Sequence, residues 1–249
     1  MTQRWNGTVF LEPGRLTFHG RIGSAHAHAH AAVQIVIVTS GTVELTDRHG
    51  HARPVRGAVI PARALHTVRA LDAWGTLVYC DTDSVLGRAV RSRPAAGDRI
   101  ADWVGAGPPD GPGDLARLVA REHPAGPAHP AVRAATARIR TLLGGPIRLE
   151  DVAAAAGISP SRLGHLFAQE VGMSFPTYLR WARLRRAIEL VRAGSTLTRA
   201  AHGAGFSDSS HLTRVVHEMF GTAPSELLRG LRWEGPAGAE AAPHGTHAG

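Results

Sequence analysis

The chain has 249 residues, of which 43% are hydrophobic, and it carries a formal net charge of +8. This apolar fraction is that of a folded protein and excludes a wholly disordered chain. The longest apolar run, near residues 33–38, is far too short to span a bilayer, and the first residues lack the apolar core of a signal peptide. A single cysteine excludes an internal disulfide framework, so we expect a cytoplasmic protein with no membrane partner.

The positive charge is unevenly distributed. All 28 basic residues are arginines, which is typical of a GC-rich genome but does not explain where they fall. Residues 131–233 hold 14 arginines against 7 acidic residues and therefore carry most of the net charge. Such a concentration favours a polyanionic partner for the C-terminal half.

Residues up to about 82 have the pattern of short β-strands. Runs rich in β-branched and apolar residues end at Gly, Pro or Asp signals, and residues 47–50 form a plausible hairpin turn. This spacing predicts a sandwich or barrel. The expected strands are residues 33–39, 42–46, 52–55, 58–60, 65–68 and 74–79.

A histidine-rich segment precedes the longest of these runs. On a strand, alternate side chains share one face. This segment would therefore have an apolar back and a polar front, and the front would face a pocket. The front would be formed by His26, His28, His30, Gln34, Val36 and Val38, with Ile35 and Ile37 on the back.

Composition divides the rest of the chain. Residues 94–130 are rich in Pro and Gly and predict a linker with one helix near 114–122. Residues 131–233 show apolar spacings of three and four, which indicate helices. Residues 234–249 predict a disordered tail. We therefore expect an α+β protein of two domains, 1–93 and 131–233, joined by the linker 94–130.

Two segments of the C-terminal half predict helix-turn-helix units. In residues 149–171 a short helix ends at Gly157, Ser159 caps the next helix, and Pro160 suits its first turn. The same plan recurs about 48 residues later, with a turn at 203–205 and a second helix over 208–220. An amphipathic helix over 175–193 separates the units. Each unit would place its second helix in a DNA major groove.

Residues 149–230 closely resemble the DNA-binding domain of the AraC/XylS family of bacterial transcription regulators. The resemblance implies two helix-turn-helix subdomains, joined by one helix, that read adjacent major-groove segments. His165, Ala168 and the pair His217-Glu218 stand where the family commonly has basic residues. The resemblance is carried by Leu149, Ala153, Ala154, Gly157–Ser161, Leu163, Leu166, Phe167, Gly172–Phe175, Tyr178, Leu179, Arg183, Leu184, Ala187, Ala204–Ser210, Arg214, Val215, Phe220, Gly221 and Pro224.

The outward positions of the two second helices are the candidate DNA contacts. Arg162 and Arg214 are the best candidates for bidentate contact with guanine. Arg183, Arg185 and Arg186 would contact phosphates or form salt bridges in the core. The remaining candidates are Ser161, His165 and Gln169 in the first unit, and Ser209, Ser210, Thr213 and His217 in the second.

The N-terminal part resembles the cupin β-barrel. His28, His30, Gln34 and Gly41 follow the first cupin motif, with glutamine where metal-binding cupins often carry glutamate. Residues 57–61 and His66 follow the second motif, with Arg63 in place of an expected glycine. The resemblance implies that His28, His30, Gln34 and His66 form the metal set, with His26 as a fourth imidazole or a residue at the mouth. Three imidazoles suit a divalent transition metal, whereas the Gln34 amide could instead bind an organic effector.

These features favour a sequence-specific DNA-binding transcription regulator. Its cupin domain would sense a small molecule or a metal ion and modulate promoter binding, and we expect no catalytic residues. Two alternatives stay open: a cupin metalloenzyme of oxygenase or isomerase type fused to a DNA-binding module, and a constitutive DNA binder with a dimerising cupin. The expected partners are double-stranded DNA, the effector, a second copy of the chain and RNA polymerase.

Overall fold

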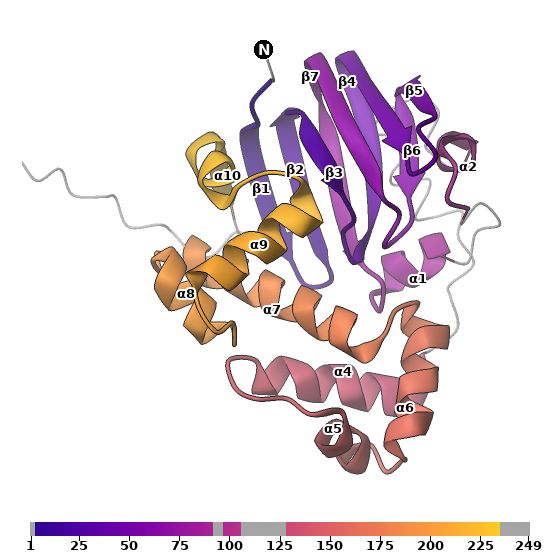
Figure 1. Ribbon diagram of the computed structural model, residues 1–249, viewed down its shortest axis with the longest axis vertical. Helices are drawn as coiled ribbons and strands as arrows, with labels where there is room; N and C mark the ends of the chain where they lie inside the picture. Colours follow the sequence, from indigo (N-terminus) through magenta and orange to yellow (C-terminus); the bar gives the residue numbers. More distant parts are fainter. Residues whose placement is uncertain (1–2, 92–96, 106–127, 235–249) are drawn as a thin grey trace, which may run out of the picture.

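The computed structural model describes residues 3–91, 97–105 and 128–234. The described residues up to 105 form a sheet region, and residues 128–230 form a helical region (Figure 1). The predicted helix at 114–122 lies outside the described residues. The strands of the sheet region are β1 (Asn6–Glu12), β2 (Arg15–Arg21), β3 (Ala25–His28), β4 (Ala32–Asp47), β5 (Ala52–Val55), β6 (Gly57–Ile60) and β7 (His66–Asp81).

Two long antiparallel strands, β4 and β7, organise the sheet. They pair from Ala32 with Asp81 to Asp47 with His66, and their register shifts around Ser40. On either side of this irregularity each strand takes different partners: β4 pairs with β6 and then β5, and β7 pairs with β3 and then β2. Each long strand therefore serves both halves of the sheet, which is why two predicted runs merge into one strand in each case.

The histidine segment differs from its prediction. Strand β3 ends at His28 and β4 begins at Ala32, so His30 lies in a connection between two strands. The expected continuous strand is therefore wrong, and His26 is exposed, but Val36 and Val38 still face a different apolar cluster from Ile35 and Ile37, as predicted. Strands β1 and β2 are missing from the expected runs, although Leu16 and Phe18 of β2 alternate with polar residues as in a half-buried strand.

Two short helices follow β7. Helix α1 (Val85–Arg91) continues from the last strand, and α2 (Ile100–Gly105) lies inside the stretch expected to be a linker. Trp103 of α2 is fully buried, and Asp47 accepts a hydrogen bond of 3.0 Å from the backbone N–H of Ile100. This part of the expected linker is therefore packed against the sheet.

The helical region contains two helix pairs with tight glycine turns. Ser159 caps α6 by accepting from the N–H of Arg162, and Asp208 caps α9 by accepting from the N–H of His211. Gly157 and Gly205 take left-handed backbone conformations in the two turns. The helices are α4 (Pro130–Leu142), α5 (Leu149–Ala155), α6 (Pro160–Leu166) with a π-helical turn (Phe167–Val171), α7 (Phe175–Arg192), α8 (Leu197–Gly203), α9 (Ser209–Phe220) and α10 (Pro224–Gly230).

The two regions share one continuous apolar core. Helix α7 lies across one end of the sheet, and α9 lies alongside β3 (Figure 1). Leu184 and Val216 belong to the same buried cluster as Phe18 and Leu77 of the sheet. The expectation of an all-helical C-terminal region needs a correction, because β8 (Leu231–Glu234) pairs in parallel with β1. Among the described residues, the helices are all too short or too polar to cross a membrane.

Candidate ligand site and nucleic-acid interface

Three histidines predicted to bind a ligand meet inside the sheet region. His28 ends β3, His30 follows it, and His66 opens β7 opposite His28. One ring nitrogen from each lies within 4.8 Å of the other two, and all three side chains are buried. The ring centroids of His28 and His66 are 4.1 Å apart. We call His28, His30 and His66 the histidine cluster.

Backbone carbonyls fix the tautomer of each ring. The Nδ1 atoms of His28, His30 and His66 lie 2.7, 2.7 and 2.9 Å from carbonyl oxygens. A carbonyl only accepts, so each Nδ1 donates, and each Nε2 of a neutral ring keeps its lone pair. Burial, together with the neighbouring His30, lowers the pKa of His28 to about 4. Burial also lowers the pKa values of His30 and His66, so all three rings are neutral at pH 7.

Gln34 completes an unusual set of acceptors. Its Nε2 donates to the Tyr79 hydroxyl at 3.0 Å, which turns its Oε1 toward His30 Nε2, also at 3.0 Å. The fixed tautomer leaves no proton between those two atoms. Nε2 of His66 is buried and has no partner among the described residues. Among the described residues, the cluster thus holds one ring nitrogen without a partner, Nε2 of His66, and a second, Nε2 of His30, that faces an amide oxygen.

These lone pairs suit the coordination of a divalent transition metal. Neutral imidazoles are ligands for Zn, Ni, Cu, Fe and Co, and an amide oxygen can accompany them. Rings held through Nδ1 by backbone carbonyls are typical of metal-ligating histidines. The ring of Trp103, in α2, lies 6.1 Å from that of His66 and covers one side of the cluster.

His26 lies apart from the cluster. It is exposed on β3, and its ring stacks at 6.4 Å on that of His217 in α9. It therefore does not join the other histidines as a fourth ligand in this arrangement.

The predicted DNA-reading positions lie on the surfaces of α6 and α9. Ser161, Arg162, His165 and Gln169 are exposed in the first unit. In the second unit Ser210, Arg214 and His217 are exposed. Ser209 and Thr213 are half-buried, and the Thr213 hydroxyl donates to the Ser209 carbonyl at 2.8 Å. We call α6 with its π-helical turn, and α9, the reading helices.

The three arginines of α7 have different surroundings. Arg185 is buried, so its assignment as a DNA contact is wrong, and the alternative of a core salt bridge is correct. Arg183 is half-buried and donates to the Gly145 carbonyl at 3.0 Å. Arg186 stays near the surface in an ion pair of 3.0 Å with Glu189.

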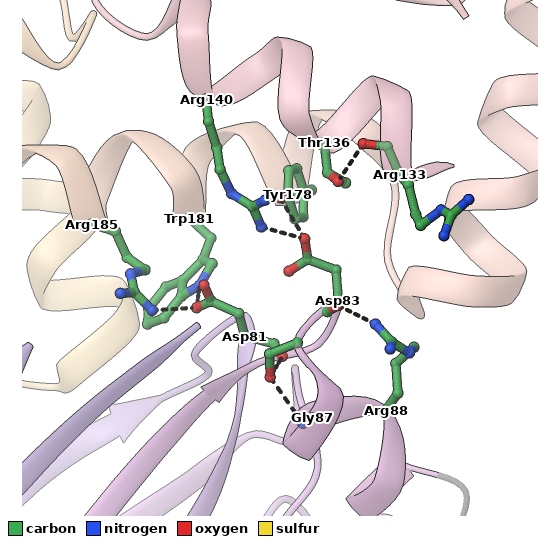
Figure 2. A network of polar contacts seen from close by, with 11 residues as sticks. Asp81, Asp83, Gly87, Arg88, Arg133, Thr136, Arg140, Tyr178, Trp181 and Arg185 are labelled. Carbon is green, nitrogen blue, oxygen red and sulfur yellow. Dashed lines mark hydrogen bonds and ion pairs between the residues drawn. The ribbon is translucent and has the colours of Figure 1, made fainter. Parts of the chain in front are cut away.

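Arg185 belongs to a polar network between the two regions (Figure 2). Asp81, at the end of β7, accepts from Arg185 at 2.8 Å and from the Trp181 indole at 2.7 Å. Arg185 also donates to the Glu12 carbonyl at 2.7 Å. Sequence reasoning missed Asp81, because nothing local marks a partner 104 residues away in the chain.

Asp83 forms the second half of this network. Its Oδ2 accepts from Arg140 at 2.6 Å and from the Tyr178 hydroxyl at 3.0 Å. Burial raises the pKa of Asp83, although Arg140 opposes that effect. These residues line a cleft of about 830 Å³ between the regions. We call Asp81, Asp83, Arg140, Tyr178, Trp181 and Arg185 the interdomain network.

Comparisons with known proteins identify the helical region. The model of a helix-turn-helix domain family matches residues 152–230. The HTH-type transcriptional activator RhaR of Pectobacterium atrosepticum is 36% identical over 88 residues, 35% of this chain and 31% of that protein. The arabinose operon regulatory protein of Salmonella typhimurium is 31% identical over 83 residues, 33% of this chain and 30% of that protein. The chain thus spans about a third of the length of these relatives.

The fold as a whole also has solved counterparts. ToxT from Vibrio cholerae covers 88% of this chain and 98% of its own, with a TM-score of 0.56 and 11% identity. One ToxT structure is described as bound to an unsaturated fatty acid. The likeness shows a sheet region followed by a helical region. Residues 152–230 therefore form a helix-turn-helix domain similar to those of AraC-type transcription regulators.

Proposed function

We propose that this protein is a sequence-specific transcription regulator whose cupin-like sheet region senses a divalent transition metal at His28, His30 and His66. The observation that carries the metal assignment is the acceptor-only set of the cluster. Ring nitrogens of three neutral histidines converge, Nε2 of His66 has no partner among the described residues, and Gln34 Oε1 lies 3.0 Å from Nε2 of His30. A cation is the partner that such a set accepts. When bound, the ion would act as a structural effector and not as a catalyst.

Two exposed faces support sequence-specific DNA binding. Arg162 on α6 and Arg214 on α9 are exposed, next to short polar side chains that can approach base edges. The excess of arginine in the helical region would add contacts with phosphates. A homodimer, a contact with RNA polymerase and a cytoplasmic location stay predictions.

Strand β3 offers a direct route from the cluster to DNA binding. His28 belongs to the cluster, while the N–H of His26 on the same strand donates to the Gly221 carbonyl at 3.0 Å. Gly221 directly follows the last residue of α9. An ion that repositions His28 would therefore act on the end of a reading helix and shift the population between states of different DNA affinity.

Metal content of tag-free protein from metal-replete growth tests the sensor. We expect about one equivalent per chain by mass spectrometry and none in His28→Ala/His66→Ala. His26→Ala is the matched control, since this histidine lies outside the cluster. Wild-type protein without metal, or a double variant that keeps it, would refute the metal assignment.

DNA binding is tested with duplexes selected from a random library. Affinity for the selected duplex should exceed that for random DNA and fall steeply with salt. It should also change when a chelator removes the metal. An affinity that no chelator or added metal alters would favour the constitutive binder, and an affinity equal to that for random DNA would refute the regulator.

The interdomain cleft supports a second candidate effector, a small organic ligand. Asp83 Oδ1 and Arg88 Nε line it and are buried without partners among the described residues. The fatty acid named for ToxT makes an unsaturated fatty acid the first probe. A rise in melting temperature with oleate that persists in His28→Ala/His66→Ala would favour this candidate over the metal.

A further inference from the structure

Both reading helices end in the same way. The first, α6 with its π-helical turn, is followed by Gly172, and α9 is followed by Gly221. Both glycines take the left-handed conformation, with φ of +76° and +64°. Each lies beside backbone carbonyls at the carboxyl end of its helix, where the helix dipole is negative and carbonyls lack partners within the helix.

The sheet region supplies donors to both of these ends. Arg91, the last residue of α1, donates to the Glu170 carbonyl at 2.5 Å and to the Gln169 carbonyl at 3.3 Å. At α9, the N–H of His26 donates to the Gly221 carbonyl at 3.0 Å, and the N–H of Ala29 donates to the Glu218 carbonyl at 3.1 Å. Figure 1 shows α1 above the end of α6 and β3 beside α9.

The contacts at both glycines are close. A Cβ added to Gly172 would lie 2.7 Å from the Arg91 guanidinium. A Cβ added to Gly221 would lie 2.4 Å from the His26 carbonyl oxygen and 2.8 Å from Nδ1 of His28. Both helix ends are therefore in direct contact with the sheet region.

We propose that the sheet region is a two-point clamp that sets the position of one reading helix relative to the other. Arg91 and Gly221 are its positioning residues. The reading helices belong to separate helix pairs linked by α7, so donors from α1 and from the β3 segment of one sheet region hold both of their ends at once. The proposal rests on the proposed role of α6 and α9 in reading DNA, but it requires neither bound metal nor bound DNA.

A distance measurement between the reading helices tests the clamp directly. Ser161→Cys and Ser210→Cys place spin labels on the exposed faces of α6 and α9, while the single native Cys80 is buried. Pulsed electron resonance on metal-free protein without DNA should give one narrow distance distribution. Arg91→Ala should at least double its width, and Arg91→Lys should restore it, because an ammonium also donates to helix-end carbonyls.

Matched controls separate the loss of the clamp contacts from a general loss of structure. Arg88→Ala removes an arginine of the same helix that donates to the Asp83 carbonyl in the sheet region, and it should leave the distribution narrow. Gly221→Ala should shift the distribution, because its Cβ meets the β3 backbone. Gly157→Ala should not, since it carries the same left-handed strain with nothing within 4 Å.

The result that overturns the clamp is a wild-type distribution in Arg91→Ala. An equal effect of Arg88→Ala, or of Gly157→Ala and Gly221→Ala, would overturn it as well. If Gly221→Ala fails to fold, the distance distributions of Arg91→Ala and Arg91→Lys decide whether the clamp exists. Because neither DNA nor metal is present, this outcome is independent of the experiments on DNA affinity and metal content.

Discussion

The structure buries two polar clusters, and they differ in how their hydrogen bonds are met. In the interdomain network donors face acceptors. Asp81 accepts hydrogen bonds from Arg185 and Trp181, and one oxygen of Asp83 accepts them from Arg140 and Tyr178. In the histidine cluster, Nε2 of His66 has no partner among the described residues, and Nε2 of His30 faces the oxygen of the Gln34 amide, which cannot donate to it. Most side chains of both clusters are buried, with Arg140 of the network exposed, so burial alone does not distinguish them.

This difference separates a structural contact from a ligand site. A buried group whose partner is missing costs free energy, so an acceptor-only set is retained where a ligand supplies the missing charge. In the interdomain network the charges of Asp81 and Asp83 already meet arginines, and these pairs join the two regions. The metal-free protein should therefore depend on the interdomain network for its stability, and the histidine cluster should add stability only with metal.

The largest expected effect follows from removing Arg185. Arg185→Ala leaves Asp81 buried without its cation and should lower the free energy of unfolding by about 3–5 kcal/mol. Arg186→Ala, one residue away, breaks an exposed pair with Glu189 and should cost about 1 kcal/mol or less. Urea unfolding of the metal-free protein measures both.

A second substitution tests whether the unpaired charge of Asp81 causes the loss of stability in Arg185→Ala. Asp81→Asn in the Arg185→Ala background removes the stranded charge and should recover part of the lost stability. If the two single arginine variants are equally stable, the distinction between the clusters is lost.

Metal should stabilise the protein through the other cluster. Zinc at a hundred times its dissociation constant should raise the free energy of unfolding by about 2.7 kcal/mol. His66→Ala should abolish this increment, whereas Arg185→Ala should keep it despite a lower baseline. An increment that survives in His66→Ala would place the metal elsewhere.

The sequence predicted much of this arrangement, for identifiable reasons. Gly157, Ser159 and Pro160 mark a turn and a cap locally, so the first helix pair was confirmed almost to the residue. His28, His30 and His66 came from motif spacing, and the structure brings them together.

Other features depend on distant pairing and leave no local pattern. Arg185 has helical spacing whether it faces DNA or Asp81, and the choice is made by a strand 104 residues away. Strand β8 forms because β1 offers it a free edge. Trp103 lies in a stretch rich in Pro and Gly, whose composition conceals a helix anchored by Asp47.

Replacing an exposed arginine on a reading helix should weaken DNA binding and leave stability unchanged, whereas replacing Arg185 lowers stability. Arg214→Ala should weaken binding to the selected duplex by about 1–3 kcal/mol, or roughly five-fold to more than a hundred-fold, by loss of base contact. Its urea midpoint should match wild type, because the side chain is exposed. Arg229→Ala on α10, also exposed, is the control for general charge. Equal losses in both would mean that Arg214 contributes charge alone.

The smallest expected effect concerns Asp47, a satisfied acceptor beside the histidine cluster. Burial raises the pKa of its carboxyl, but hydrogen bonds from the backbone N–H groups of Ile100, His51 and His49 outweigh burial and lower it to about 2. Asp47→Asn can keep two of these bonds but not all three, so it should cost about 1 kcal/mol at pH 7.

The pH dependence of that cost identifies its origin. A carboxyl with a depressed folded-state pKa stabilises the protein above its ordinary pKa of 3.8, and the contribution is lost as pH falls toward 2. The difference between wild type and Asp47→Asn should therefore shrink between pH 4 and pH 2 in urea unfolding. A difference that stays constant over this range would show that the carboxylate charge is not what holds α2 against the sheet.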